Sequence, residues 1–205
     1  MNPLDQLIAY FENFPGIGAR QARRFAFHIL TMTPEETKEF STLVSGLQDS
    51  VTECASCRRF FAKNDGHSDI CELCASPSRD NSKLLVVERD TDIRSIERSG
   101  VYSGLYFVLG GTVPLLESRE NKKLRGGGFK RIIEARLGAG LSEVILGFSV
   151  NPDGENTGRF VESIIREIEG SDKIKVSHLG RGLSTGSELE YADPETLKNA
   201  LQNRY

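Results

Sequence analysis

The chain has 205 residues, of which 38% are hydrophobic, and it contains no tryptophan. No run approaches the roughly 20 apolar residues of a membrane-spanning helix, and the N-terminus lacks the pattern of a secretory signal, so we expect a cytoplasmic protein. The 26 basic and 29 acidic residues give a formal net charge of −3, which argues weakly against a nucleic-acid partner. The distribution of charge along the chain matters more than this sum.

Three helices are expected at the N-terminus. The first carries an apolar stripe at helical spacing, which is either the core of a small domain or an oligomer contact: Leu4, Leu7, Ile8 and Phe11. Pro15, Gly16 and Gly18 predict a tight turn before a second helix that runs to Leu30, so the two helices form a helix-hairpin-helix. Thr33 and the following Pro-Glu-Glu predict the capped start of a third helix.

The start of the second helix combines free main-chain donors with positive charge. Its unpaired N–H groups and the positive end of the helix dipole favour a phosphate ligand. Arg20, Arg23 and Arg24 follow, and no acid lies between Phe14 and Thr31. The sequence therefore predicts a phosphate site, and the alternative is that the arginines merely cover a helix surface.

A second concentration of basic residues follows later in the chain. Its members are Arg119, Lys122, Lys123, Arg125, Lys130, Arg131 and Arg136, against Glu120 and Glu134. The motif "RGGGFK" within it reads as an exposed flexible loop. The cluster is either a solvated surface or a second region that follows a phosphate backbone.

All four cysteines lie in two Cys-x-x-Cys pairs, Cys54 with Cys57 and Cys71 with Cys74. In a cytosolic chain this confinement disfavours disulfides. Two such pairs supply four thiolates at the corners of a tetrahedron, with no position left for water. We therefore predict one structural Zn²⁺ ion per chain, and we assign no catalytic role to any of the three histidines.

From Ser82 onward, strands and helices alternate. Strands are expected at 83–88, 104–111, 142–150 and 173–180, with a helix capped by Thr91 or Asp92 after the first. After the third strand we expect the loop "NPDGENTG" and a helix over 159–169, and Pro194 opens a last helix. This order predicts a parallel sheet with helices on both faces and with ligand groups at the carboxyl ends of its strands.

This region resembles the Toprim fold of topoisomerases, primases and some nucleases. The resemblance implies a magnesium site made by a glutamate after the first strand and an Asp-x-Asp after a later one. The chain keeps Glu88 but has Asn151-Pro152-Asp153 in the second place. Either Asp90, Asp92, Asp153 and Glu155 assemble a weak site, or these residues are helix caps.

The order of the parts resembles the RecR family of bacterial recombination mediators along nearly the whole chain. The motifs that carry the resemblance are "FPGIGARQARRFAFHIL", the cysteine segment, "LLVVERDTDIRSIERSGVYSGLYFVLGG", "EVILGFSVNPDGENTG" and "GLSTGSELEYADPETLKNAL". It implies an α+β chain of several parts: a helix-hairpin-helix domain (1–53), a four-cysteine zinc finger (54–76), a Toprim domain with a mainly parallel sheet (80–175), and a C-terminal strand and helix segment (176–205).

The resemblance also implies a function and its residues. RecR proteins are non-catalytic and form rings, commonly tetrameric, that encircle DNA and act with RecO and RecF to load RecA onto single strands. By the hairpin motif, the DNA-contacting residues are Gly16, Gly18, Arg20 and Arg24. The RecO-facing acids are Glu88, Asp92, Asp153 and Glu155. Two rival interpretations are a magnesium-dependent Toprim nuclease or phosphoryl-transfer enzyme, and a scaffold that binds only proteins.

Overall fold

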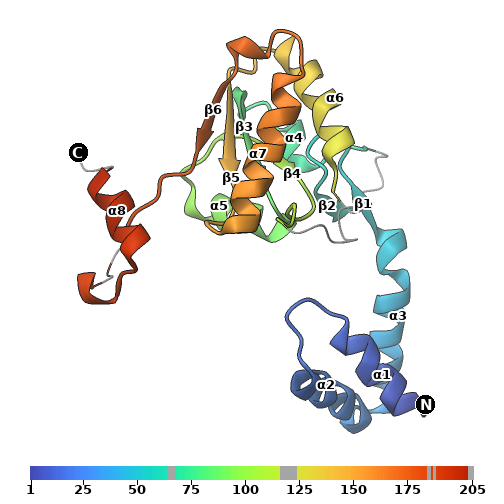
Figure 1. Ribbon diagram of the computed structural model, residues 1–205. Helices are drawn as coiled ribbons and strands as arrows, with labels where there is room; N and C mark the ends of the chain where they lie inside the picture. The colour runs from blue at the N-terminus through green and yellow to red at the C-terminus, as the bar shows by residue number, and fades with distance from the viewer. Residues whose placement is uncertain (64–67, 116–123, 184–185, 187, 203–205) are drawn as a thin grey trace. The chain divides into compact units, whose positions relative to one another are not determined.

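The chain folds into two compact units, Met1–Thr52 and Glu53–Tyr205. The computed structural model describes all residues except 64–67, 116–123, 184–185, 187 and 203–205 (Figure 1). Across the described residues, no helix is both long enough and apolar enough to cross a membrane.

The first unit consists of the three expected helices, α1 (Pro3–Glu12), α2 (Ala19–Thr31) and α3 (Pro34–Ser50). The predicted start of α3 is confirmed, because the Thr33 N–H donates to Glu36 Oε2 at 2.8 Å. In return, the Glu36 N–H donates to Thr33 Oγ1 at 3.2 Å. This reciprocal capping box satisfies two main-chain donors that the helix itself leaves unpaired.

The core of the first unit lies between α1 and α2. Ala22 and Ala26 of α2 are fully buried, and the rings of Phe11 and Phe25 meet edge to face with centroids 5.8 Å apart. The apolar stripe on α1 is half-buried, so it contributes to this core. By contrast, no residue of α3 is buried. Its apolar residues lie at spacings of three and four along one face, 43–65% exposed: Phe40, Leu43, Val44 and Leu47.

The second unit begins with the cysteine segment. Strand β1 (Val51–Glu53) pairs with β2 (Phe60–Ala62), and the short helix α4 (Glu72–Ala75) follows. The elements that come next alternate: β3 (Asp80–Val87), α5 (Asp90–Ser99), β4 (Gly104–Val108), α6 (Gly126–Leu137), β5 (Glu143–Gly147), α7 (Pro152–Arg166) and β6 (Lys175–His178). One 3-10 turn (Ser171–Lys173) lies between α7 and β6, and a second (Leu189–Tyr191) precedes the last helix, α8 (Pro194–Gln202).

The four long strands form one parallel sheet in the order β4-β3-β5-β6, as predicted. Side chains of β3 alternate between its two faces. Leu84 and Val86 belong to a core with Phe129 of α6 and Val161 of α7. Figure 1 shows these two helices side by side over one face of the sheet. On the opposite face lie the neighbouring residues Leu85 and Val87.

The opposite face is covered by α5 and the cysteine segment. Ile93 of α5 packs there together with Phe61 and three of the cysteines. A main-chain hydrogen bond from the Val108 N–H to the Cys57 carbonyl, 2.8 Å long, joins the end of β4 to this segment. The metal-binding motif is therefore part of the core of the sheet domain.

Three local expectations are corrected by the structure. The motif "RGGGFK" is not a loop, since its glycines form the first turn of α6. The segment "NPDGENTG" begins α7, because Asn151 is the N-cap and its Oδ1 accepts the Gly154 N–H at 2.8 Å. Helix α5 begins at Asp90, and Asp92 lies in its first turn rather than at the cap.

The parallel sheet extends past the predicted domain end at residue 175. Strand β6 runs to His178, and its residues pair with β5 throughout, for example Val176 with Val144. The sheet domain therefore includes the start of the segment that the sequence assigned to the C-terminal part.

Candidate metal centre, glycine hairpin and Toprim edge

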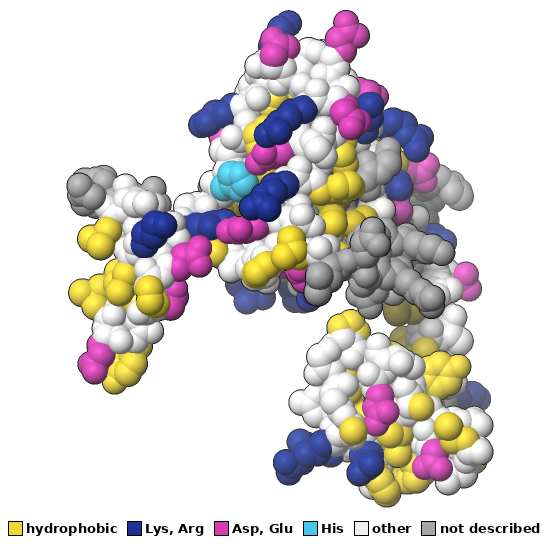
Figure 2. Space-filling view, in the orientation of Figure 1, with side chains coloured by type: hydrophobic (Ala, Val, Ile, Leu, Met, Phe, Trp, Pro, Cys, Tyr) yellow, Lys and Arg dark blue, Asp and Glu magenta, His cyan; other side chains and the backbone are white. Residues whose placement is uncertain are grey.

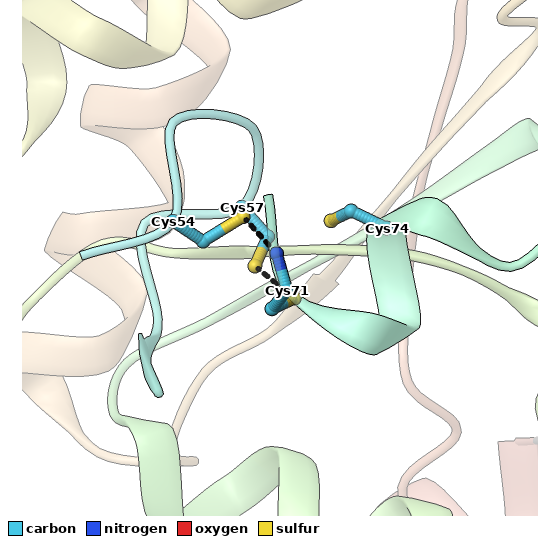
Figure 3. Close-up of side chains that lie close together, drawn as sticks. All are labelled: Cys54, Cys57, Cys71 and Cys74. Carbon is cyan, nitrogen blue, oxygen red and sulfur yellow. Dashed lines mark hydrogen bonds between the residues drawn. The ribbon is translucent and has the colours of Figure 1, made fainter. Parts of the chain in front are cut away.

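Cys54, Cys57, Cys71 and Cys74 converge on one point (Figure 3). Their sulfur atoms all lie within 4.8 Å of one another, and the sulfurs of Cys57 and Cys71 are 3.6 Å apart. Zn–S bonds of about 2.3 Å in a tetrahedron require sulfur atoms about 3.8 Å apart. None of the four forms a disulfide, and three are fully buried. The geometry therefore fits a closed structural zinc site.

Main-chain hydrogen bonds shape the turns that carry the thiols. The Arg58 N–H donates to the Cys54 carbonyl at 2.9 Å, and the Cys54 N–H donates to the Arg59 carbonyl at 2.8 Å. Arg58 has a φ of 65°, the left-handed conformation that reverses the chain after Cys57. The second pair lies at α4, where Cys71 precedes the helix and Cys74 is within it.

The chemistry of the thiols also favours a cation. Hydrogen bonds from Cys57, Cys71 and Cys74 hold the pKa of the Cys54 thiol far below its ordinary value. The Cys71 N–H also donates to Cys54 Sγ at 3.3 Å. Hydrogen bonding among the four groups also lowers the pKa of the Cys71 thiol and raises the pKa of Cys57 and Cys74, so a divalent cation is needed to hold all four as thiolates.

Two arginines of the predicted basic cluster fasten this centre to the sheet domain. Arg125 Nε forms an ion pair with Glu53 Oε1 at 2.9 Å, and its Nη1 donates to the Arg58 carbonyl. Arg136 Nη2 donates to Ser56 Oγ at 2.8 Å. These guanidinium groups are engaged within the protein, while Arg119, Lys122 and Lys123 lie outside the described residues. Arg125 and Arg136 therefore have a structural role.

The glycine hairpin has the geometry of a phosphate site. Gly16 has a φ of +75°, which favours glycine, and Ile17 N donates to the Phe14 carbonyl at 3.1 Å to close the turn. Gly18 is the N-cap of α2 and supplies no side-chain cap. Within the described residues, the N–H groups of Gly18, Ala19 and Arg20 have no main-chain acceptor. These donors point out of the start of α2.

Positive charge surrounds this helix start. Arg20, Arg23 and Arg24 are all exposed, and none forms an ion pair with a described carboxylate. Arg20 and Arg24 are one turn apart and so lie on the same side of α2. Figure 2 shows Lys and Arg side chains gathered on the α2 side of the first unit, next to exposed hydrophobic side chains. The structure thus brings Gly16, Gly18, Arg20 and Arg24 together at one helix terminus.

Glu88 lies at the carboxyl edge of the sheet, between β3 and β5, where the strand order reverses direction. It is only 7% exposed, and its Oε1 accepts the Ser149 N–H at 2.7 Å. Glu88 therefore holds the loop that follows β5 against the end of β3.

Three of the other four Toprim acids also accept hydrogen bonds from main-chain donors, and Glu155 pairs with the Arg181 side chain. Asp92 accepts the Arg89 N–H at 2.8 Å, Asp153 accepts the Leu115 N–H at 3.0 Å, and Asp90 accepts the Phe60 N–H at 2.7 Å. Among the described residues, the cysteines are the sole group of metal ligands that converge. The carboxylates therefore do not fit the magnesium site that the Toprim fold implies, and the alternative of caps and loop anchors is the one observed.

The chain combines three parts: a glycine hairpin with unpaired arginines, a four-cysteine centre and a Toprim sheet. This combination is typical of a class of multi-part DNA-binding proteins. Three family models match the chain in the same order: "RecR, helix-hairpin-helix" at residues 4–45, "Toprim domain" at 82–180 and "RecR, C-terminal" at 182–205.

Full-length relatives agree with the models. The chain is 37% identical over 201 residues to the "Recombination protein RecR" of Rubrobacter xylanophilus, and 33% identical over 202 residues to that of Ligilactobacillus salivarius. These alignments cover 98% of this chain and 95% or 96% of the relatives. The chain therefore belongs to the RecR family and has a role in recombinational DNA repair, in which it interacts with DNA.

Proposed function

We propose that the chain is a non-catalytic mediator that holds DNA through the α2 hairpin and works as a homo-oligomeric ring, tetrameric as in the family it belongs to. In this proposal its partners are RecO and RecF, it helps to load RecA onto single strands, and it acts in the cytoplasm. The observation that carries the DNA contact is the set of unpaired N–H donors flanked by Arg20 and Arg24.

The DNA contact that we propose does not depend on the base sequence of the DNA. Main-chain N–H groups and guanidinium groups bind phosphate, which carries no base information. Each protomer offers few such contacts, so binding should depend on several protomers that hold one DNA molecule together. The exposed apolar face of α3 supports oligomer formation, because Phe40, Leu43, Val44 and Leu47 have no covering element within their own unit.

The acidic edge of the sheet supports a protein partner over a catalytic metal. Asp153 and Glu155 lie in the first turn of α7, and Glu155 is exposed and pairs with Arg181 at 3.3 Å. With Asp92 they form the surface that we propose for RecO. Glu88, which is buried, contributes by positioning the loop after β5.

The hairpin is tested by charge reversal. Arg20→Glu/Arg24→Glu should weaken DNA binding by roughly ten-fold or more at about 0.1 M salt and reduce the steepness of its salt dependence. Lys38→Glu/Lys173→Glu changes the net charge by the same amount at two exposed sites that are not part of the hairpin and form no ion pair with a described carboxylate. If both double variants lose the same affinity, the effect is one of overall charge and the hairpin assignment is wrong.

The rival enzyme interpretation is tested in the same preparation. Labelled DNA incubated with Mg²⁺ should stay intact, because the acids do not converge on a metal site. Cleavage that Glu88→Gln abolishes would contradict the non-catalytic assignment.

A further inference from the structure

Phe60 is an exposed aromatic residue on the cysteine segment. Strand β2 alternates, with Phe61 buried in the core at 8% exposure and Phe60 on the outside at 55%. The ring is not free to collapse onto the surface. Its main-chain N–H donates to Asp90 Oδ1 at 2.7 Å, and the Arg125 guanidinium lies 5.0 Å from the ring centroid.

Arg125 is itself held in place, so it acts as a rigid support for the ring. Its side chain is only 14% exposed and forms the 2.9 Å ion pair with Glu53. A cation over one part of the ring fixes its orientation and leaves the rest open to solvent. An aromatic surface that is already ordered loses little conformational entropy when it binds a flat ligand.

Unpaired positive charge lies on and just before the helix that is bonded to Phe60. The bond between Phe60 and Asp90 places the start of α5 beside β2. Arg89, Arg94 and Arg98 are exposed, and no described carboxylate forms an ion pair with them. Arg94 and Arg98 are one turn apart on the helix.

The acids of α5 are already engaged with other groups. Asp92 accepts the Arg89 N–H, and Glu97 forms an ion pair with Arg79 and accepts the Tyr106 hydroxyl. Asp90 accepts the Phe60 N–H. These three acids therefore bind other groups, and none of them forms an ion pair with Arg89, Arg94 or Arg98. The surface made by Phe60, Arg89 and Arg94 thus joins an aromatic face to cations that can bind an anion.

We propose that this surface binds single-stranded DNA, with one base stacked on Phe60 and the phosphate backbone following Arg89 and Arg94. An exposed ring next to unpaired cations is the combination that binds single strands without sequence preference. A base pair within a duplex is stacked on both faces, so only an unstacked base can reach the ring. The inference rests on the proposed DNA-binding function, but the site lies in the second unit and uses no residue of the hairpin.

The absence of tryptophan from the chain allows a direct test. In the full-length protein, Phe60→Trp introduces one tryptophan per chain, which can be excited at wavelengths where the five tyrosines do not absorb, and an oligothymidylate should quench its emission. An abasic oligonucleotide of the same length carries the same phosphates without bases and should quench much less. Leu179→Trp is the matched control, because Leu179 is 51% exposed and follows β6 at the opposite edge of the sheet.

Affinity measurements complete the test. Phe60→Leu keeps an apolar side chain, and it should weaken oligothymidylate binding roughly ten-fold while leaving duplex binding nearly unchanged. The zinc content of each variant reports whether the cysteine segment is folded. Equal quenching by abasic and thymidylate strands would overturn the proposal, and so would equal quenching by polyglutamate, which would assign the surface to an acidic protein.

The two DNA sites can be tested separately. In an Arg20→Glu/Arg24→Glu background, the thymidylate quenching of Phe60→Trp should persist at low salt. If quenching is absent while the hairpin substitutions still weaken duplex binding as predicted, the second site is wrong and the proposed function stands.

Discussion

At the scale of single residues, Glu88 shows how position decides the role of a carboxylate. The sequence places it after the first strand, where the Toprim resemblance implies a metal ligand. In the structure its Oε1 accepts the Ser149 N–H, so it links two neighbouring strands at the point where the sheet order reverses. A buried carboxylate without a hydrogen-bond donor is costly, and the Ser149 N–H supplies a donor to Glu88.

Substitution of Glu88 separates this role from metal binding. Glu88→Ala removes a hydrogen bond to a carboxylate that joins two strand ends, and it should lower the free energy of unfolding by about 1.5–3 kcal/mol. Glu88→Gln keeps an acceptor oxygen and should cost less. Urea denaturation followed by circular dichroism measures both. If the glutamine variant is as unstable as the alanine variant, the negative charge is what the site needs, and the loop-anchor role is wrong.

At the scale of elements, the hairpin between α1 and α2 depends on one glycine for its backbone and on another for its open helix start. Gly16 has a positive φ, whereas Gly18 has a φ of −86° that any residue adopts. A Cβ added at either position meets no atom within 4 Å. An added Cβ therefore has equal space at both positions, and the two glycines differ in backbone conformation. Alanine substitutions at these two positions can be compared directly.

Alanine substitutions should expose this difference. Gly16→Ala forces a left-handed alanine and should destabilise the hairpin by about 1–2 kcal/mol. Gly18→Ala should have a smaller effect on stability. The measurement is thermal unfolding together with duplex binding, which should weaken more for Gly16→Ala. Equal losses for the two variants would show that the hairpin does not need the left-handed turn.

At the scale of the whole molecule, the cysteine centre is a core element of the sheet domain. Three thiols pack with Leu85, Val87 and Val108 on one face of the sheet, and Cys57 accepts a hydrogen bond from the end of β4. Metal binding and the folding of this face should therefore be coupled.

Removal of the metal tests this coupling. A chelator, or Cys57→Ser, should release zinc and reduce amide-exchange protection at Val108. Protection at Val161, on the face covered by α6 and α7, should fall less. Zinc content and hydrogen exchange are the measurements. A metal-free protein with unchanged protection at Val108 would show that the centre is independent of the sheet.

The oligomer contact that we propose for the apolar face of α3 can be tested by substitution. Leu43 and Leu47 are 65% and 59% exposed on the apolar face of α3, where charge would prevent association. Leu43→Asp/Leu47→Asp should lower the solution mass toward that of a monomer and weaken DNA binding with it. Val101→Asp, at an 85% exposed position, is the control. An unchanged mass for the double variant would exclude this face from the oligomer contact.

The sequence by itself determined the elements and most of their order. Apolar residues spaced three and four apart indicated the helices, and short apolar runs such as "LLVV" and "YFVL" indicated the buried strands. The two Cys-x-x-Cys pairs indicated the metal centre. These features are local, so neighbouring residues are enough to define them. The apolar stripe on α1 was visible in the same pattern, but periodicity does not tell a core from an oligomer contact.

Only the tertiary structure decided what the polar groups do. Glu88, Asp90 and Asp153 accept N–H groups from residues that are far away in sequence, so no local pattern could distinguish them from magnesium ligands. In the same way, the chain pairs Arg125 with Glu53, and so part of an apparent DNA-binding cluster fastens the cysteine segment to the sheet domain. A charged side chain acts through its nearest partner, and folding selects that partner.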